Sequence, residues 1–247
     1  MKLRSIFMIL CAGAVIALGA MLPGIVGQRR DAAEQGRIQF APVQEVRLEF
    51  ADSGITMKQT LAIMGPMRDV VSIPEELATL KRSKVERIAA DAAQRYNQAG
   101  VLLGDPGDFS GYSMVGGYTV LVYGPETSSN VFWIVDYGDP EWNSWFHMVI
   151  DDRTGTVCSV EYRGLEAEYD SWEMQQILEG FCQTYLEGLG EEFFDYSGSD
   201  LADKADRDAD SSYMAAQLRF DAWDDPLYGE TRIVFFLNRN GFYTYFE

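Results

Sequence analysis

The chain begins with a long apolar stretch. Residues 5–27 carry no charged side chain, and basic residues flank them on both sides: Lys2, Arg4, Arg29 and Arg30. At about 1.5 Å of rise per residue, a helix of this length crosses a hydrocarbon core of roughly 30 Å. The pattern therefore predicts a signal anchor or signal peptide in residues 1–30, with membrane contact through residues 5–27.

Two interpretations of this segment remain open. A cleaved signal peptide has a short apolar centre followed by a small-x-small site, and Ala-Leu-Gly at 17–19 provides such a site. The apolar run continues through 19–26, which favours an uncleaved anchor. Lipid attachment at Cys11 is discounted, because Leu10 stands where a lipoprotein signal has a small residue.

Beyond the anchor, the hydrophobic residues no longer form a continuous run and instead follow the spacings of short strands and helices. In residues 46–50 apolar and charged residues alternate, which is typical of a half-buried strand. Thr56 is then expected to cap a short helix over residues 57–64, which Gly65 and Pro66 end.

Two longer helices follow from the helical spacing of apolar residues. Ser83 and Glu86 have the spacing of a capping box, which predicts that a helix begins there, and Gly100 is expected to end it. A second helix is expected to begin at Asp170 or Ser171. Runs of β-branched and aromatic residues predict seven strands, over residues 112–123, 131–137, 145–151, 156–163, 213–222, 231–237 and 242–246.

The order of these elements repeats. Each long helix precedes a series of strands that closes with a Gly-ended turn, at 152–155 and at 238–241. We therefore predict an α+β fold of two helix-plus-antiparallel-meander halves, residues 83–165 and 166–247, behind a juxtamembrane segment, residues 31–82. Several strands are apolar on both faces, so the halves are expected to pack together or share a sheet. Gly-ended hairpins are common, which leaves coincidence as the alternative to an internal duplication.

One of these hairpins carries a motif. Residues 149–157 follow the pattern hydrophobic-x-Asp-x-x-Thr-Gly-hydrophobic, through Asp151 or Asp152, Thr154 and Gly155. With the helix and strands before it, the motif resembles the PepSY group of small extracytoplasmic domains. That resemblance implies a cystatin-like helix-on-sheet fold and a non-catalytic inhibitory or regulatory role, and it transfers no catalytic residue. The second half lacks the Asp-Thr pair. The overall layout is also similar to uncharacterised membrane-anchored proteins of Gram-positive bacteria.

The excess of acidic over basic residues excludes some classes of binding partner. The formal net charge is −18, and four of the 20 basic residues but none of the 38 acidic ones lie in the first 30 positions, so the body carries −22. Such a body repels nucleic acid and anionic lipid head groups. The flanking basic residues alone do not orient the anchor. Together with the acidic body, the signal-like segment favours a single-pass protein of the cell membrane with its body on the extracytoplasmic side.

Catalytic chemistry has few candidates in this sequence. His147 is the only histidine, and the chain contains no Gly-x-Ser-x-Gly, Ser-x-x-Lys or P-loop pattern. Asp136, Asp139 and Glu141 lie near two tryptophans and form the least improbable set of acids for a glycosidase, but turn-forming acids at a hairpin tip are the better explanation. We therefore expect no enzyme and no cofactor.

Two groups of side chains are candidates for binding. Trp142 and Trp145, with Asp139 and Glu141, form the predicted contact surface, because large rings on strand connections often bind partners or sugars. Asp206, Asp208 and Asp210 match the first three ligand positions of a calcium loop. That pattern then breaks at Ser211 and Gln217, and a solvated acidic loop is the alternative.

Cys158 and Cys182 are candidates for a disulfide between the first sheet and the second helix, with two buried thiols as the alternative. Together, these features predict a non-enzymatic extracytoplasmic interaction or regulatory module with a protein or peptide partner. The alternative is a ligand-binding or sensing ectodomain, for wall saccharide at the Trp142/Trp145 tip or calcium at the acidic loop.

Overall fold

The computed structural model describes residues 55–65, 70–103, 109–124, 128–139, 141, 143–164, 168–207, 213–222 and 229–247. They belong to one compact unit, Asp52–Glu247. The predicted anchor and the strand predicted over 46–50 lie outside these residues. Within the described part of the chain, no helix combines the length and apolar character needed to span a membrane.

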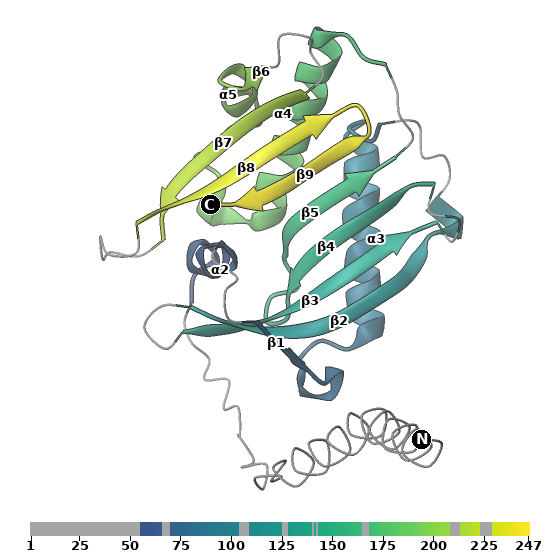
Figure 1. Ribbon diagram of the computed structural model, residues 1–247, viewed down its shortest axis with the longest axis vertical. Coiled ribbons are helices and arrows are strands. Elements are labelled where there is room, and N and C mark those ends of the chain that lie inside the picture. The colour runs from purple at the N-terminus through teal and green to yellow at the C-terminus, as the bar shows by residue number, and fades with distance from the viewer. Residues whose placement is uncertain are drawn as a thin grey trace, which may run out of the picture. The chain divides into compact units, whose positions relative to one another are not determined.

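The fold is α+β and is built on a single antiparallel sheet. In the described residues the strand order is β1-β2-β3-β4-β5-β9-β8-β7-β6 (Figure 1). The strands are β1 (Val70–Ile73), β2 (Ser113–Tyr123), β3 (Ser129–Gly138), β4 (Trp145–Asp151), β5 (Val157–Arg163), β6 (Asp206–Arg207), β7 (Tyr213–Asp221), β8 (Glu230–Asn238) and β9 (Gly241–Phe246). The helices are α2 (Met57–Met64), α3 (Arg82–Gln98), α4 (Ser171–Leu189) and α5 (Gly198–Asp203), with 3-10 turns at Glu75–Leu77, Phe109–Gly111 and Glu191–Phe193.

All seven predicted strands are confirmed within one or two residues. The sequence did not predict β1, β6 and α5, because two to six residues are too few to establish a hydrophobic period. Both predicted turns are present, and Gly155 takes the left-handed conformation (φ 76°) that its turn requires.

The helix starts test the capping predictions. Thr56 and Gln59 exchange side-chain-to-backbone hydrogen bonds at the start of α2, and Asp170 caps α4 in the same way. The capping box predicted at Ser83 is wrong. α3 begins at Arg82 without a side-chain cap, and the Glu86 carboxylate accepts from Met114 N (3.3 Å) instead. A tertiary contact of Glu86 thus replaces the local one.

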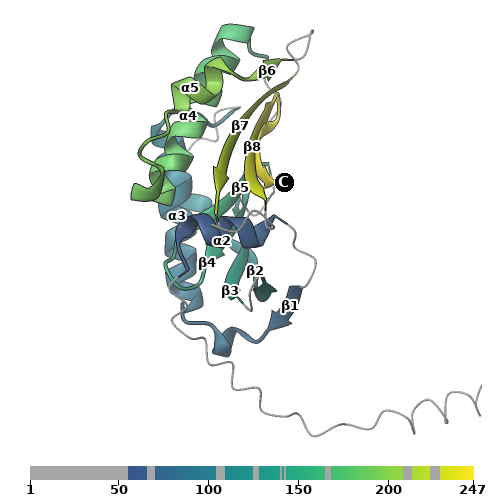
Figure 2. The same ribbon diagram turned by 90° about the vertical axis from the view of Figure 1, so that its left-hand side faces the viewer.

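Helices α3 and α4 cover one face of the sheet (Figure 2). A cluster of rings fills the layer between them and the strands. The Phe242 ring of β9 lies 4.2 Å from the Phe181 ring of α4, 5.3 Å from the Tyr96 ring of α3 and 5.4 Å from the Tyr162 ring of β5. The hydrophobic core is therefore continuous across the whole sheet.

A narrow seam joins the two ends of the sheet. β5 pairs with β9 only through Glu161–Arg163 and Gly241–Tyr243. A Cβ atom on Gly241 would lie 1.8 Å from the Tyr162 carbonyl oxygen, so the close approach of the two backbones requires glycine here. Side-chain contacts extend the seam, because Thr244 Oγ1 accepts from Val160 N (3.1 Å).

A buried carboxylate organises the β4–β5 hairpin. Asp152 is almost fully buried and accepts three hydrogen bonds, from Thr79 N (2.6 Å), Leu80 N (2.8 Å) and Trp133 Nε1 (2.9 Å). The neighbouring Asp151 is also buried and binds its own turn. Asp152 thereby ties the hairpin to β3 and to the segment that enters α3.

We predict that Asp152→Ala lowers the free energy of unfolding by about 3 kcal/mol, because it leaves the buried N–H groups of Leu80 and Trp133 and the partly buried N–H of Thr79 unpaired. Urea unfolding followed by circular dichroism measures this. Asp139→Ala is the matched control, since Asp139 also accepts three hydrogen bonds but is exposed to water. Equal urea midpoints for the two variants would show that Asp152 does not have this role.

We also predict that Gly241→Ala lowers the free energy of unfolding by about 2 kcal/mol or more, because the added methyl group forces β9 away from β5. Gly111→Ala is the control, since no heavy atom lies within 4 Å of the added Cβ. Thermal unfolding of both variants would test this prediction, and an unchanged midpoint for Gly241→Ala would contradict it.

Candidate functional site

We call the face of the sheet opposite α3 and α4 the outer face. It carries a group of ionisable and aromatic side chains. Because neighbouring strands pair in register, five residues form one row across five strands: Phe236, Tyr243, Glu161, His147 and Asp136. Directly opposed residues of paired strands point to the same face. We call this set the cross-strand row.

The middle of the row is a charged group. His147 Nδ1 lies 2.7 Å from Asp136 Oδ1, and about a third of each side chain is exposed. On the other side of His147, Glu161 Oε1 accepts from Arg163 Nε at 2.7 Å. The Arg163 guanidinium in turn lies over the Trp145 ring, 5.5 Å from its centre. One tryptophan of the predicted contact surface thus belongs to the same group.

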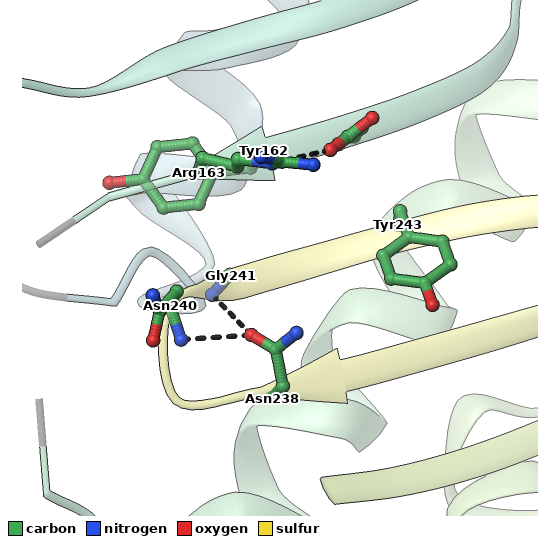
Figure 3. Close-up of a pocket in the computed structure, with 7 residues that line it drawn as sticks. Tyr162, Arg163, Asn238, Asn240, Gly241 and Tyr243 are labelled. Carbon is green, nitrogen blue, oxygen red and sulfur yellow. Dashed lines mark hydrogen bonds and ion pairs between the residues drawn. The ribbon is translucent and has the colours of Figure 1, made fainter. Parts of the chain in front are cut away.

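Two hollows adjoin the row at the seam between β5 and β9. The first has a volume of about 350 Å³ and is lined by Glu161, Tyr162, Arg163, Asn238, Asn240, Gly241 and Tyr243 (Figure 3). The second, about 390 Å³, is lined by Met64, Gly65, His147, Val149, Ser159, Glu161, Tyr243, Thr244, Tyr245 and Phe246. Glu161 and Tyr243 line both, so they stand between the two hollows.

Helix α2 completes the second hollow. Its first two backbone N–H groups donate to the Glu192 carboxylate, at 3.1 Å from Met57 N and 3.2 Å from Lys58 N. Arg153 Nη2 donates to the Ile55 carbonyl oxygen at 2.8 Å. These contacts hold the start of α2, while its end, at Met64, forms part of the hollow.

Aromatic rings extend the row away from the charged group. The Tyr213, Phe236 and Tyr243 rings stack in sequence, with centres 5.2 and 4.8 Å apart. The Tyr245 ring lies 6.0 Å from that of Tyr243 and is 40% exposed. Exposed rings on a sheet face provide rigid contact area for a partner.

The other residues of the predicted contact surface lie at the β3–β4 turn. Glu141 N donates to the Asp139 carboxylate (2.5 Å), and the backbone and side chain of Asn143 donate to it too. The hydrogen bond from Glu141 N lowers the pKa of Asp139 most, desolvation opposes it, and the two hydrogen bonds from Asn143 lower the pKa further. Asp139 therefore has the contacts of a turn-forming acid. Trp142 lies outside the described residues.

The predicted calcium ligands are only partly described. Asp206 begins β6 and pairs with Ala215, whereas Asp208 and Asp210 lie outside the described residues. Within the residues that the structure describes, no three acidic, histidine or cysteine side chains are grouped closely enough to hold a metal ion.

Cys158 and Cys182 are both buried, and the structure holds them as free thiols. Burial raises the pKa of each thiol well above its ordinary value. The Tyr185 hydroxyl of α4 donates to the Cys158 carbonyl oxygen (2.5 Å) and joins the helix to β5 without a covalent bond.

The sequence analysis predicted Trp145 as a contact residue but did not predict the cross-strand row. Alternation along β4 places His147 on the same face as Trp145, and that signal was available in the sequence. The contribution of Tyr243 was not, because nothing local in the sequence indicates that β9 pairs with β5.

Comparisons of the chain with protein-family models, with curated proteins and with solved structures found no match.

We predict that Cys158 and Cys182 do not react with iodoacetamide in the native protein and react fully in urea, because a buried thiol with a raised pKa forms little thiolate. Peptide mapping by mass spectrometry separates these sites from Cys11. A disulfide-linked peptide containing both residues would contradict the prediction.

Proposed function

We propose that this chain is a non-enzymatic binding module, held in the bacterial membrane by residues 5–27 with its body outside the cytoplasm. It binds a protein or peptide partner through the outer face of the sheet. The observation that carries this proposal is the cross-strand row with its two adjacent hollows and partly exposed tyrosines. Contiguous exposed apolar surface rimmed by polar groups is typical of interaction sites.

The contacts around His147 support binding more than catalysis. A hydrolytic triad would need a nucleophile on the imidazole, and the one serine that lines the hollow is Ser159. Its Oγ instead contacts Thr244, at 3.2 Å from Oγ1 and 3.4 Å from the carbonyl oxygen. Glu161 is held by Arg163. These side chains present fixed donors and acceptors to a ligand.

We further propose that the body consists of two cystatin-like, PepSY-like halves. In each half a long helix, α3 or α4, precedes an antiparallel series of strands with a closing hairpin. The last strands of the two series, β5 and β9, pair with each other in antiparallel orientation, as a twofold relation between the halves requires. A non-catalytic regulatory role agrees with that resemblance.

A saccharide ligand is the second candidate function. The first hollow presents the flat polar groups of Asn238, Asn240 and Arg163 beside the Tyr243 ring (Figure 3). Amide and guanidinium groups next to an aromatic ring suit the hydroxyl groups and apolar faces of a sugar.

To test the proposal, the full-length protein would be crosslinked in native membranes, purified by affinity and examined by mass spectrometry. We expect one dominant partner protein, and we expect the double variant Tyr243→Ala/Tyr245→Ala to lose it at least tenfold. Trp172→Ala is the matched control, because Trp172 is an aromatic residue on α4 that is 68% exposed. A partner recovered equally from the double variant, or no partner at all, would refute the proposal, and enrichment of wall saccharide alone would favour the second candidate.

A further inference from the structure

The second hollow is lined by apolar side chains and by one acidic side chain, that of Glu161. Met64, Val149 and Phe246 supply the apolar lining, and Glu161 stands at the edge with about a quarter of its side chain exposed. The volume of about 390 Å³ lies within the range of small-ligand pockets, roughly 300–1,000 Å³. An occupant therefore needs an apolar stem and a polar end.

The carboxylates near the hollow retain unused acceptor oxygens. Arg163 occupies Glu161 Oε1, and His147 occupies Asp136 Oδ1, at 2.7 Å in both contacts. In the described part of the chain, Glu161 Oε2 and Asp136 Oδ2 make no hydrogen bond or ion pair. A carboxylate can accept at both oxygens, so each has room for one more donor.

The aromatic wall also favours a positive charge. Lysine and arginine cations are attracted to the faces of tyrosine rings within about 6 Å, and Tyr243 and Tyr245 both line the hollow. Burial, Tyr245 and Glu161 raise the pKa of Tyr243, whereas Arg163 lowers it. Glu161 thus contributes negative potential at Tyr243.

The charge of the whole body points in the same direction. With a net charge of −22 beyond residue 30, the body attracts cationic partners and repels acidic ones. The side chains of the hollow and the negative electrostatic field of the body therefore both favour a cationic partner.

We infer that the second hollow binds a lysine or arginine side chain from an extended basic segment of the partner protein. The aliphatic stem packs against Val149 and Met64, and the cation binds Glu161 Oε2 next to the Tyr243 and Tyr245 rings. This inference rests on the proposed function, and it names the partner class.

The test uses the full-length protein in detergent and two fluorescent peptides, Ac-Ala-Lys-Ala-Lys-Ala and the same peptide with norleucine in place of lysine. We expect at least tenfold tighter binding of the lysine peptide in fluorescence anisotropy, and we expect salt to weaken it. Equal affinities of the two peptides would overturn the inference.

Single-residue variants test whether the lysine peptide binds in the second hollow. Glu161→Gln should weaken binding of the lysine peptide about tenfold, whereas Glu187→Gln, which removes the same charge from an exposed position on α4, should change it less than twofold. Tyr245→Leu keeps the bulk and removes the ring, and it should weaken binding several-fold even if Glu161→Gln does not fold. Equal losses for the two glutamate variants would indicate a nonspecific charge effect and overturn the inference.

The co-purification experiment separates this inference from the proposed function. If the partner is lost with Tyr243→Ala/Tyr245→Ala but retained fully by Glu161→Gln, the outer face is a binding surface and the basic-side-chain inference is wrong. If Glu161→Gln loses the partner as well, while Glu187→Gln keeps it, both are supported.

Discussion

The arrangement of this protein depends on one buried carboxylate. Asp152 accepts hydrogen bonds from the segment before α3, from the Trp133 indole of β3 and from no basic side chain in the described residues. A buried anion is stable only where enough donors replace its lost water. The three donors therefore hold the β4–β5 hairpin against β3 and against the segment before α3, and that hairpin carries Trp145, His147 and Glu161.

The seam between β5 and β9 is the second constraint. The register of this short ladder places Tyr243 opposite Glu161 on the outer face, and it depends on the close approach of Gly241 to Tyr162. Glycine at position 241 thus allows β5 and β9 to pair and to join the two sets of strands into one sheet. The residues of this seam therefore contribute both to the fold and to the proposed binding surface.

Much of the fold could be predicted from the sequence because its signals are local. Runs of β-branched and aromatic residues located all seven longer strands, and the cap at Thr56 follows from residues within one turn. The prediction at Ser83 failed because Glu86, the glutamate of the predicted capping box, accepts a hydrogen bond from the distant Met114 N instead. The site was harder, since the cross-strand row depends on the pairing of distant strands, and only the shared face of Trp145 and His147 was visible beforehand.

The same seam has a consequence for biosynthesis. Val160 and Thr244, which bond across it, are separated by 84 positions in the chain. The ribosome therefore synthesises β5 well before β9, and the sheet becomes continuous only when β9 is present and the Phe242 ring packs against that of Tyr162. Long-range pairing of this kind slows folding. A nascent chain must keep the β5 edge from pairing with other strands until β9 emerges.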